Sequence, residues 1–579
     1  MTDRLKSFES ALSAADRPEI WIDIVDNATL RTEFDRASGP LAGMLLAVKN
    51  NVDVAGLPTT AACPGFADAP AATDADAVAR LRRAGATVVG TTNMDQFATG
   101  LVGQRSPYGG VRDARRPAYV SGGSSSGSAV AVALGIADIA IGTDTAGSGR
   151  VPAALQGIVG IKPTLGLVST RGLVPACKSW DAVTIMARDL ETANVAMGAM
   201  AGGASTRPVP VRVPLKATPD PVVAIPAKLP GVTPDWVLAF ERSADRLRAN
   251  GVTIRPVPFD DFVHAARLLY EGGLVAERHA SVGSYVDANR AQVDRVVGDI
   301  ISDAGTISAT RYLADRAHLD DLRTRCSALL DGCDGLMVPT APGHPSIAEV
   351  AADPVGVNAW LGTYTNFANL FDMCGVAVPA GTAGSAQFGV TILAPAFHDA
   401  VALDIARLAN QPATSVAHAG ANGPLEPAAP WIETAIAPTT DLFVVGAHLP
   451  GQPLEGQLTA RGARYVGPSR TAAGYRLFAL NTEPAKPGLV RDRGRGSEID
   501  GGIWRLSPSA LAAFLSDLPE PMSLGPVELV DGMHVVGFGC DASALDEAME
   551  ITEFGGWLHY LECNEPQGDR NLTQSSDAT

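Results

Sequence analysis

The sequence has few of the groups on which most hydrolases and metalloenzymes depend. Its nine histidines and seven cysteines are scattered along the chain. The cysteines show neither metal-ligand spacing nor a disulfide framework, and neither Cys177 nor any histidine forms a recognisable set with a candidate nucleophile. Histidine-based and cysteine-based hydrolase mechanisms are therefore weak hypotheses. We expect no metal and no cofactor.

Long apolar runs and an excess of positive charge are also missing. No stretch of about 18 apolar residues predicts a membrane span, and the first residues, MTDRLK, lack the apolar core of a secretory signal. A formal net charge of −17 argues against a nucleic-acid-binding surface. We therefore expect a cytoplasmic protein that binds neither membrane nor nucleic acid. Its few basic residues would have to cluster to attract a small anionic substrate.

Lysine is scarce, because the chain has seven lysines and relies on arginine for its positive charge. One of the seven, Lys49, ends the apolar run LLAVK. A buried lysine can lose its proton, whereas an arginine effectively cannot. Lys49 is therefore a candidate base, although a solvated lysine at the end of a strand is the simpler alternative.

Another candidate, Ser148, lies in a turn of small residues between an apolar run and a helix start. The strand-like run covers residues 136–141, and the helix start VPAAL at 151–155 carries proline where it is well tolerated. Such a junction exposes backbone N–H groups, and the helix dipole adds partial positive charge. A glycine-rich turn with a serine is more often only a turn, but here it has the donors that acyl transfer needs. The expected oxyanion hole consists of the amides of Thr145, Ala146, Gly147 and Ser148.

A serine- and glycine-rich segment, SGGSSSGS, covers residues 121–128. Its composition suits a flexible linker. However, the small apolar run AVAVAL that follows, at 129–134, is typical of a buried helix that ends at glycine. A phosphate-binding loop does not fit, because its Gly-Lys-Ser/Thr ending is absent. We predict a structured turn that presents a serine.

Together these segments resemble the amidase signature family, whose pattern is a Lys–Ser–Ser triad. The resemblance implies that Ser148 is the nucleophile, that Ser124, held by a cis peptide bond, is the bridging serine, and that Lys49 is the ultimate base. Ser126 and Ala146 stand where the family usually has glycine, and both are small enough to leave the triad intact. The matching segments are Lys49 at its strand end, GGSS at 122–125, GTDTAGS at 142–148 and GIKPT at 160–164.

Within this family the chain resembles the allophanate hydrolase branch. It shares the phrase NMDQFATG at 93–100 and a C-terminal module. In that branch a tyrosine and an arginine recognise the substrate, and Tyr270 and Arg278 occur in the matching context. Their spacing is a little over two helical turns, so both can face one pocket, and arginine pairs with carboxylate bidentately. Without the resemblance, Arg278 would be taken as one of many surface arginines. The expected substrate-binding residues are Gly122, Gly123, Tyr270 and Arg278.

The length of 579 residues predicts at least two domains. Strand-like and helical segments alternate over roughly residues 40–190, which favours a mixed α/β core, and residues 240–333 are typical of longer helices. The resemblance implies an amidase-signature fold, a mixed twisted sheet covered by helices, plus a smaller C-terminal α+β domain. The predicted divisions are an amidase signature domain at 1–412, a linker at 413–440, a γ-glutamylcyclotransferase-like domain at 441–572 and a disordered tail at 573–579.

The resemblance implies hydrolysis of allophanate (urea-1-carboxylate) to ammonia and N-carboxycarbamate, which then yields further ammonia and CO2. His448 is a candidate for the second step, although a lone histidine after an apolar strand is more often structural. A general amidase, an amidotransferase component that supplies ammonia to glutamyl-tRNA, and an inactive amidase-like binding scaffold are the alternatives. The resemblance also implies a homodimer, coupled in function to a urea carboxylase or a biuret hydrolase.

Overall fold

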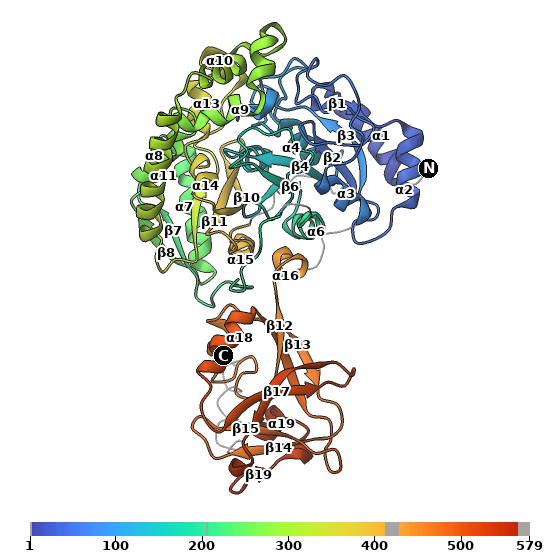
Figure 1. The fold of residues 1–579 in the computed structure, drawn as a ribbon, viewed down its shortest axis with the longest axis vertical. Coiled ribbons are helices and arrows are strands. Elements are labelled where there is room, and N and C mark those ends of the chain that lie inside the picture. The colour runs from blue at the N-terminus through green and yellow to red at the C-terminus, as the bar shows by residue number, and fades with distance from the viewer. Residues whose placement is uncertain (1–2, 204–205, 411–427, 565–579) are drawn as a thin grey trace, which may run out of the picture. The chain divides into compact units, whose positions relative to one another are not determined.

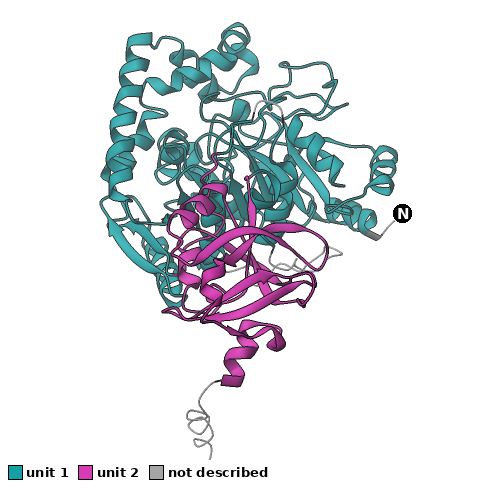
Figure 2. Ribbon diagram, turned by 60° about the horizontal axis from the view of Figure 1, so that its bottom comes forward, with its two compact units in different colours: residues 1–209, 220–436 teal, residues 210–219, 437–579 magenta. Residues whose placement is uncertain are grey.

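The computed structural model describes residues 3–203, 206–410 and 428–564, and it divides the chain into two compact units (Figures 1 and 2). Unit 1 comprises Met1–Val209 and Asp220–Ile436, and unit 2 comprises Pro210–Pro219 and Ala437–Thr579. The predicted tail at 573–579 lies outside the described residues, as do residues 413–427 of the predicted linker.

Unit 1 is built around one mixed sheet. Among the described residues it has eleven strands in the order β1-β3-β2-β4-β6-β5-β10-β11-β9-β7-β8. Their bounds are β1 (Trp21–Ile24), β2 (Leu45–Lys49), β3 (Thr87–Thr92), β4 (Ile139–Asp144), β5 (Val159–Lys162), β6 (Ala182–Ala187), β7 (Val222–Pro226), β8 (Thr253–Val257), β9 (Gly335–Pro339), β10 (Cys374–Ala383) and β11 (Ala386–Ala394).

Helices pack around this sheet (Figure 1). Their bounds are α1 (Asp3–Ala15), α2 (Asn27–Arg36), α3 (Asp76–Arg83), α4 (Ser126–Ala133), α5 (Val151–Gln156), α6 (Leu190–Met200), α7 (Pro234–Ala249), α8 (Asp260–Leu268), α9 (Ala276–Ala288), α10 (Arg295–Ala304), α11 (Ala309–Leu329), α12 (Ile347–Ala352), α13 (Gly356–Leu361), α14 (Asn366–Leu370), α15 (Asp399–Ala409) and α16 (Trp431–Ala435), with short 3-10 helices η1 (Pro18–Ile20), η2 (Gln96–Ala98), η3 (Gly273–Val275) and η4 (Arg290–Gln292). Helices α4 and α5 contact one another and the sheet, and α3, α6, α16, α15 and α7 form a second contacting row. The predicted mixed α/β core is confirmed.

Several element ends follow from local sequence. Helix α3 ends just before Gly85, which has φ of +100°, and α4 ends just before Gly135, which has φ of +72°; glycine adopts this left-handed backbone without a steric penalty. Helix α5 begins at Val151 with Pro152 in its first turn, as predicted. The strand predicted at 136–141 instead starts at Ile139, because residues 134–138 form the turn that follows α4.

The pairing of β2 with β4 places the candidate base beside the candidate nucleophile's turn. The two strands are parallel, with Ala47 opposite Ala140 and Val48 opposite Ile141. Their carboxyl ends therefore meet at one edge of the sheet. Lys49 is the last residue of β2, and Asp144 is the last residue of β4 before the small-residue turn.

Residues 240–333 contain the expected long helices, but the edge strand β8 interrupts them. This strand pairs in parallel with β7. The pairing depends on a distant segment, so the helical pattern of residues 240–333 does not predict it. The described part of the predicted linker, residues 428–440, includes helix α16, whose Trp431 and Ile432 are buried against unit 1.

Unit 2 is small and rich in strands. Among the described residues it has a five-stranded sheet ordered β13-β16-β12-β18-β17 and a three-stranded sheet ordered β15-β14-β19. Its elements are β12 (Thr440–Val444), α17 (Glu455–Thr459), β13 (Arg464–Arg470), β14 (Tyr475–Leu480), β15 (Lys486–Arg491), β16 (Asp500–Leu506), α18 (Pro508–Ser516), β17 (Met522–Glu528), β18 (His534–Cys540), η5 (Ala542–Leu545), β19 (Met549–Glu550), η6 (Thr552–Phe554) and α19 (Trp557–Asn564).

A ten-residue segment from the first half of the chain also belongs to unit 2. Residues Pro210–Pro219 cluster with the C-terminal residues, and the side chains of Val213 and Leu215 are fully buried. The Leu215 N–H donates to the Gly462 carbonyl oxygen at 3.0 Å, and Arg464 Nη2 donates to the Leu215 carbonyl oxygen at 2.6 Å. Unit 2 is therefore assembled from two separate stretches of sequence.

Candidate active site

Lys49 is completely buried at the end of β2. Its Nζ lies 2.8 Å from Ser124 Oγ and 2.7 Å from Thr143 Oγ1. The segment before α4 supplies Ser124, and β4 supplies Thr143. The structure therefore brings the candidate base into direct contact with the candidate bridging serine, from positions 75 residues apart.

Ser148 lies in the turn after β4, and its hydroxyl is not part of the hydrogen-bonded set of Lys49, Ser124 and Thr143. Its Oγ donates to the Gly100 carbonyl oxygen at 3.5 Å. Within the described residues no hydrogen bond links Ser148 to Ser124. The structure therefore joins Lys49 to Ser124 by a hydrogen bond but does not join Ser124 to Ser148.

Two glycines and a cis peptide bond shape the segment that carries Ser124. The Gly123–Ser124 bond is cis, as the family resemblance implies. A Cβ on Gly123 would lie 2.2 Å from Asp95 Oδ2, and one on Gly122 would lie 2.9 Å from Pro152 Cα. Gly122 and Gly123 therefore allow close packing of this segment, with room for no larger residue.

The turn at 145–148 has its peptide groups held in fixed orientations. Asn369 Nδ2 donates to the Asp144 carbonyl oxygen at 2.7 Å, which sets the peptide that carries the Thr145 N–H. The Ala146 carbonyl oxygen accepts from Thr365 Oγ1 at 2.7 Å, and the next N–H, that of Gly147, donates to Asp144 Oδ1 at 2.8 Å.

This arrangement divides the predicted oxyanion donors into two groups. The Gly147 N–H already has an acceptor, the Asp144 carboxylate. The N–H groups of Thr145, Ala146 and Ser148 have no hydrogen-bond acceptor among the described residues. The N–H groups of Thr145, Ala146 and Ser148 are thus available for a ligand oxygen. The Gly147 N–H, also predicted as a donor, is engaged in holding the turn.

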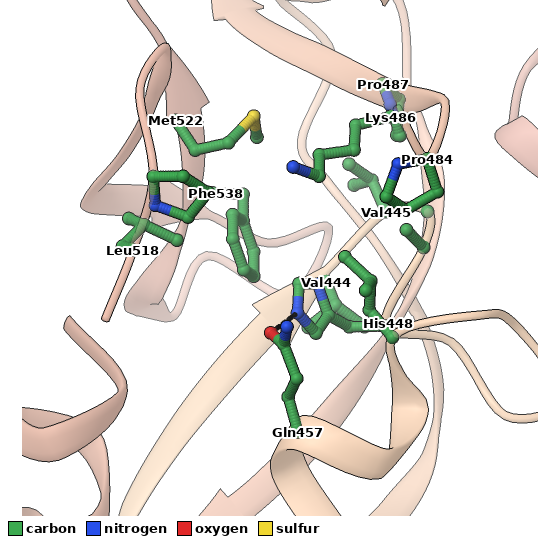
Figure 3. Close-up of a pocket in the computed structure, with 14 residues that line it drawn as sticks. Val444, Val445, His448, Gln457, Pro484, Lys486, Pro487, Leu518, Met522 and Phe538 are labelled. Atoms are coloured by element: carbon green, nitrogen blue, oxygen red, sulfur yellow. Dashed lines mark hydrogen bonds between the residues drawn. The ribbon is translucent and has the colours of Figure 1, made fainter. Parts of the chain in front are cut away.

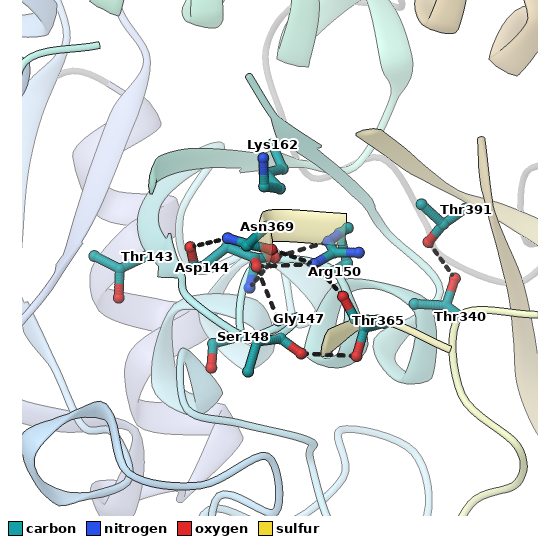
Figure 4. Close-up of polar contacts among 12 residues, drawn as sticks. Thr143, Asp144, Gly147, Ser148, Arg150, Lys162, Thr340, Thr365, Asn369 and Thr391 are labelled. Atoms are coloured by element: carbon teal, nitrogen blue, oxygen red, sulfur yellow. Dashed lines mark hydrogen bonds and ion pairs between the residues drawn. The ribbon is translucent and has the colours of Figure 1, made fainter. Parts of the chain in front are cut away.

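A buried ion pair supports the turn from behind (Figure 4). Arg150 Nε and Nη2 donate to the two carboxylate oxygens of Asp144 at 2.9 and 3.0 Å, and both side chains are fully buried. Arg150 Nη2 also donates to the Thr365 carbonyl oxygen and to Asn369 Oδ1. Burial acts to raise the pKa of Asp144, but the charge and hydrogen bonds of Arg150 hold it below its ordinary value.

Burial also changes the proton affinity of Lys49. It lowers the pKa of Lys49 to about 7, because the charged ammonium is disfavoured away from water, while Asp95, Asp144 and Asp181 act in the opposite direction and Arg278 adds to the lowering. A lysine with this pKa is largely neutral just above neutral pH, so Lys49 can accept a proton.

Arg278 and Tyr270 meet beside the same site. Arg278 Nη2 donates to Tyr270 Oη at 2.9 Å, and Nη1 donates to Thr99 Oγ1 at 3.0 Å and to the Ala98 carbonyl oxygen at 3.2 Å. The guanidinium is buried, and its Nε has no partner. Because Gly100 directly follows Thr99 and contacts Ser148, the strip at 98–100 links the arginine to the candidate nucleophile.

His448, the candidate of unit 2, lines a separate cavity (Figure 3). Its Nε2 lies 3.0 Å from Gln457 Oε1, and its ring stacks on Phe538 with centroids 5.0 Å apart. Burial lowers the pKa of His448, which favours the neutral ring.

Sequence reasoning did not identify the residues that hold the turn. Thr143, Asp144 and Arg150 flank the predicted nucleophile. Their polar side chains, next to a buried strand, could have marked them as residues that hold the turn. Thr365 and Asn369 reach the turn from more than 200 residues away, and no local pattern marks them. Across residues 3–203, 206–410 and 428–564, no cluster of three or more His, Cys, Asp or Glu side chains is arranged to bind a metal ion, and no helix is both long and apolar enough to cross a membrane.

Comparison with known proteins identifies the family. Residues 17–403 match the Amidase family, and residues 440–562 match the allophanate hydrolase C-terminal domain. The chain is 36% identical to the Kluyveromyces lactis allophanate hydrolase, with 97% of each chain covered and a TM-score of 0.85. It is 33% identical over 411 residues to the A-type component of the Thermus thermophilus glutamyl-tRNA(Gln) amidotransferase, covering 66% of this chain and 86% of that protein.

A longer relative matches almost the whole chain. The urea amidolyase of Saccharomyces cerevisiae is 39% identical over 591 residues, which cover 96% of this chain and 32% of that protein. The chain thus spans about a third of the length of the urea amidolyases that it matches. The two family matches and the agreement in fold establish an amidohydrolase. The chain belongs to the amidase family and carries the C-terminal domain of the allophanate hydrolases.

Proposed function

We propose that this chain hydrolyses allophanate at its terminal amide, with Ser148 as nucleophile, Ser124 as proton relay and Lys49 as base. The K. lactis allophanate hydrolase, which matches along nearly the whole chain, supports this substrate. A general amidase needs no buried arginine beside the nucleophile, and a glutamyl-tRNA amidotransferase component would not need unit 2. An inactive scaffold would have no use for a buried lysine in contact with Ser124.

The observation that carries the proposal is the environment of Arg278. A guanidinium has five N–H donors, and three of those of Arg278 go to Tyr270, Thr99 and the Ala98 carbonyl oxygen. The Nε–H and one N–H of Nη2 remain for a ligand. An arginine Nε and a terminal nitrogen together are a donor pair suited to the two oxygens of a carboxylate. Allophanate is a small amide that carries a carboxylate.

Proton transfer follows the contacts around Lys49. Neutral Lys49 donates one N–H to Thr143 Oγ1 and directs its lone pair at the Ser124 hydroxyl, 2.8 Å away. Ser124 passes its proton to Lys49 and takes the proton of Ser148 as Ser148 Oγ attacks the amide carbon. The proton returns through Ser124 to the leaving nitrogen, and ammonia departs. Water then attacks the acyl-enzyme by the same route and releases N-carboxycarbamate.

The negative charge on the tetrahedral intermediate falls on the former carbonyl oxygen. The N–H groups of Thr145, Ala146 and Ser148 are the donors placed to bind it. Because Asn369, Thr365 and Asp144 hold the adjoining peptide groups, these donors do not need to reorient during the reaction.

The direct test is to incubate the purified protein with allophanate, urea, biuret, acetamide and glutamine and to measure ammonia from each. We expect allophanate to be cleaved with a kcat/KM at least about a hundredfold above that of acetamide, because acetamide lacks the carboxylate that Arg278 binds. Equal activity on acetamide, or a preference for glutamine, would contradict the proposal.

Unit 2 offers a second step, the conversion of N-carboxycarbamate to ammonia and CO2. The supporting observation is His448, a buried histidine that lines a cavity next to Lys486 and Gln457. Two ammonia per allophanate are expected from wild type. We expect His448→Asn to leave the first release intact and to slow the second, which time courses of ammonia and CO2 would separate. If His448→Asn releases the second ammonia and the CO2 as fast as the wild type does, His448 takes no part in the second step.

The partners follow from the chemistry of the substrate. A urea carboxylase would supply allophanate, and the match to urea amidolyases supports this coupling. A homodimer stays a prediction, which sedimentation of the purified chain would test.

A further inference from the structure

Asp181 is a buried acid that takes no part in the proposed proton transfer. It lies just before β6 and is 6% exposed. Within the described residues it forms no ion pair, whereas Asp144 is paired with Arg150. A buried carboxylate without a counter-ion is costly unless hydrogen bonds replace the lost water. The hydrogen bonds of Asp181 therefore indicate why an acid occupies this position.

The carboxylate of Asp181 accepts three hydrogen bonds. Oδ1 accepts from Thr145 Oγ1 at 2.5 Å and from the Cys177 N–H at 3.2 Å, and Oδ2 accepts from the Ala176 N–H at 2.9 Å. An asparagine has one acceptor oxygen and would turn its NH2 toward one of these donors. Burial raises the pKa of Asp181, while the three hydrogen bonds and the charge of Arg278 act against that rise. The contacts thus select a carboxylate and favour its ionised form.

The pairing of two strands brings Thr145 to Asp181. Strands β4 and β6 are antiparallel, and Asp144, the last residue of β4, lies opposite Ala182, the first residue of β6. Thr145 and Asp181 are the next residues outward along the same register. Both side chains are buried. Their contact therefore extends the ladder into the turn that carries the proposed oxyanion donors.

Asn369 makes a second bridge between the same two segments. Its Nδ2 donates to the Asp144 carbonyl oxygen at 2.7 Å (Figure 4) and to the Trp180 carbonyl oxygen at 2.9 Å. Asn369 thus holds the peptide group that precedes Thr145, and Asp181 holds the Thr145 side chain. The Thr145 N–H lies between these two points of attachment and has no acceptor among the described residues.

The segment before Asp181 also contacts the helix that carries Arg278. Ser281 lies one turn after Arg278 on α9, and its Oγ donates to the Ala176 carbonyl oxygen at 3.3 Å. The N–H of the same Ala176 donates to Asp181. Asp181 therefore belongs to a continuous set of contacts that runs from the helix of the proposed carboxylate-binding arginine to the proposed oxyanion donors.

We propose that Asp181 is a positioning residue of this active site, whose carboxylate holds Thr145 so that the Thr145 N–H receives the oxygen of the tetrahedral intermediate. This role rests on the proposed function, because that reaction places an oxyanion at the turn. Preorganised donors act mainly in the transition state. Loss of the contact between Asp181 and Thr145 therefore lowers kcat and leaves KM nearly unchanged.

The negative charge of Asp181 gives a second readout. Burial lowers the pKa of Lys49 to about 7, while Asp95, Asp144 and Asp181 act to raise it and Arg278 acts to lower it. Removing the charge of Asp181 therefore lowers the pKa of Lys49 further. Because the neutral lysine is the active form, we expect the acid limb of the rate profile to move to lower pH in Asp181→Asn, by at least about 0.3 pH unit.

The test compares variants of the full-length protein on allophanate, at the pH plateau of each. Asp181→Asn and Thr145→Val each remove the contact, and we expect kcat to fall about 10- to 100-fold with KM within about threefold of wild type. Thr145→Ser keeps the hydroxyl and should retain at least about a third of the wild-type kcat. Thr145→Val keeps the charge of Asp181, so its acid limb should stay in place. The double variant should lose about as much as either single variant, because both remove the same contact.

Asp399→Asn is the matched control. Asp399 is buried and accepts from Thr164 Oγ1 at 2.7 Å and from the Thr164 N–H at 2.9 Å. Among the described residues it has no hydrogen bond to the turn at 145–148. This variant should keep kcat within about twofold of wild type and the acid limb in place. Thermal unfolding confirms that each variant is folded, and if Asp181→Asn does not fold, the two Thr145 variants decide.

Three results would each overturn the role of Asp181. They are a wild-type kcat or an unmoved acid limb in a folded Asp181→Asn, an equal loss of kcat in Asp399→Asn, and equal losses in Thr145→Ser and Thr145→Val. The rate at which a serine-directed phosphonate labels Ser148 is measured on the same variants, because this reaction uses the oxyanion donors but no allophanate. If wild type releases no ammonia from allophanate, the proposed substrate is wrong. Labelling slowed in Asp181→Asn would still support the positioning role, and labelling at the wild-type rate would contradict it.

Discussion

Lys49 Nζ and Ser124 Oγ lie 2.8 Å apart, and both side chains are fully buried. Burial lowers the pKa of Lys49 to about 7. Only the neutral amine can take a proton, so activity should rise with pH up to this value and then level off. We predict that kcat/KM for allophanate increases about tenfold per pH unit below pH 6.5 and reaches a plateau above pH 8. Initial rates between pH 5 and 9 measure this, and a flat profile would exclude a titrating lysine.

Replacing the base with a permanent cation separates charge from basicity. Lys49→Arg keeps the positive charge but cannot be deprotonated, so we expect a loss of at least about a thousandfold in kcat. Lys178→Arg, a change at an exposed lysine, is the control and should retain full activity. Retention of a tenth or more of the activity in Lys49→Arg would mean that another group is the base.

Thr365 holds the Ala146 carbonyl oxygen, and with it the turn that carries the proposed oxyanion donors. Thr365→Val keeps the shape and removes the hydrogen bond. We predict that kcat falls about 10- to 100-fold while KM changes little, because the misaligned donors matter mainly in the transition state.

The control is Thr391→Val, which removes a buried threonine hydroxyl that bonds Thr340 away from the turn (Figure 4). Its kcat should stay within about twofold of wild type. Similar losses in both variants would show that Thr365 acts through general stability.

Arg278 should set the preference for a carboxylate. Removing a charged hydrogen-bond partner from a buried site typically costs about 2–5 kcal/mol, so Arg278→Ala should raise KM for allophanate by at least about 30-fold. Cleavage of acetamide, a neutral amide, should change far less. Arg267→Ala, at an exposed arginine on α8, is the control. Equal losses on both substrates would remove Arg278 from carboxylate recognition.

The Asp144–Arg150 pair is fully buried, so its loss should appear in stability. Asp144→Asn leaves the Arg150 charge without its carboxylate, and we expect a loss of about 3–5 kcal/mol in the free energy of unfolding of unit 1. Asp261→Asn, which breaks an exposed pair with Arg325, should have little effect. Urea denaturation of both variants tests this, and equal stability would mean that the buried pair contributes nothing.

Local sequence predicted the elements around the site because their determinants are local. The apolar run before Lys49, the glycines after α3 and α4, and the proline in α5 each act within a few residues. The strand order of the sheet is different: β10 lies between β5 and β11, and that order depends on packing between distant segments. The segment at 210–219 likewise depends on contacts with the rest of unit 2. No pattern within the segment predicts these contacts.

Lys49, Ser124 and Ser148 could be singled out as the proposed triad because each of them lies in a recognisable motif. Their supports could not be, because Asn369 and Thr365 act only after the chain has folded α14 against the turn. The division of the turn's amides also depends on tertiary contacts, since the Asp144 carboxylate takes the Gly147 N–H and leaves those of Thr145 and Ala146 free.

Covalent labelling tests most directly whether Ser148 is the nucleophile that Ser124 and Lys49 activate. The protein is treated with a serine-directed phosphonate, and the modified residue is located by peptide mass spectrometry. We predict one adduct, on Ser148, none in Ser148→Ala, and labelling slowed at least about a hundredfold in Lys49→Arg. An adduct on another residue, or labelling of Ser148→Ala at the wild-type rate, would contradict this mechanism.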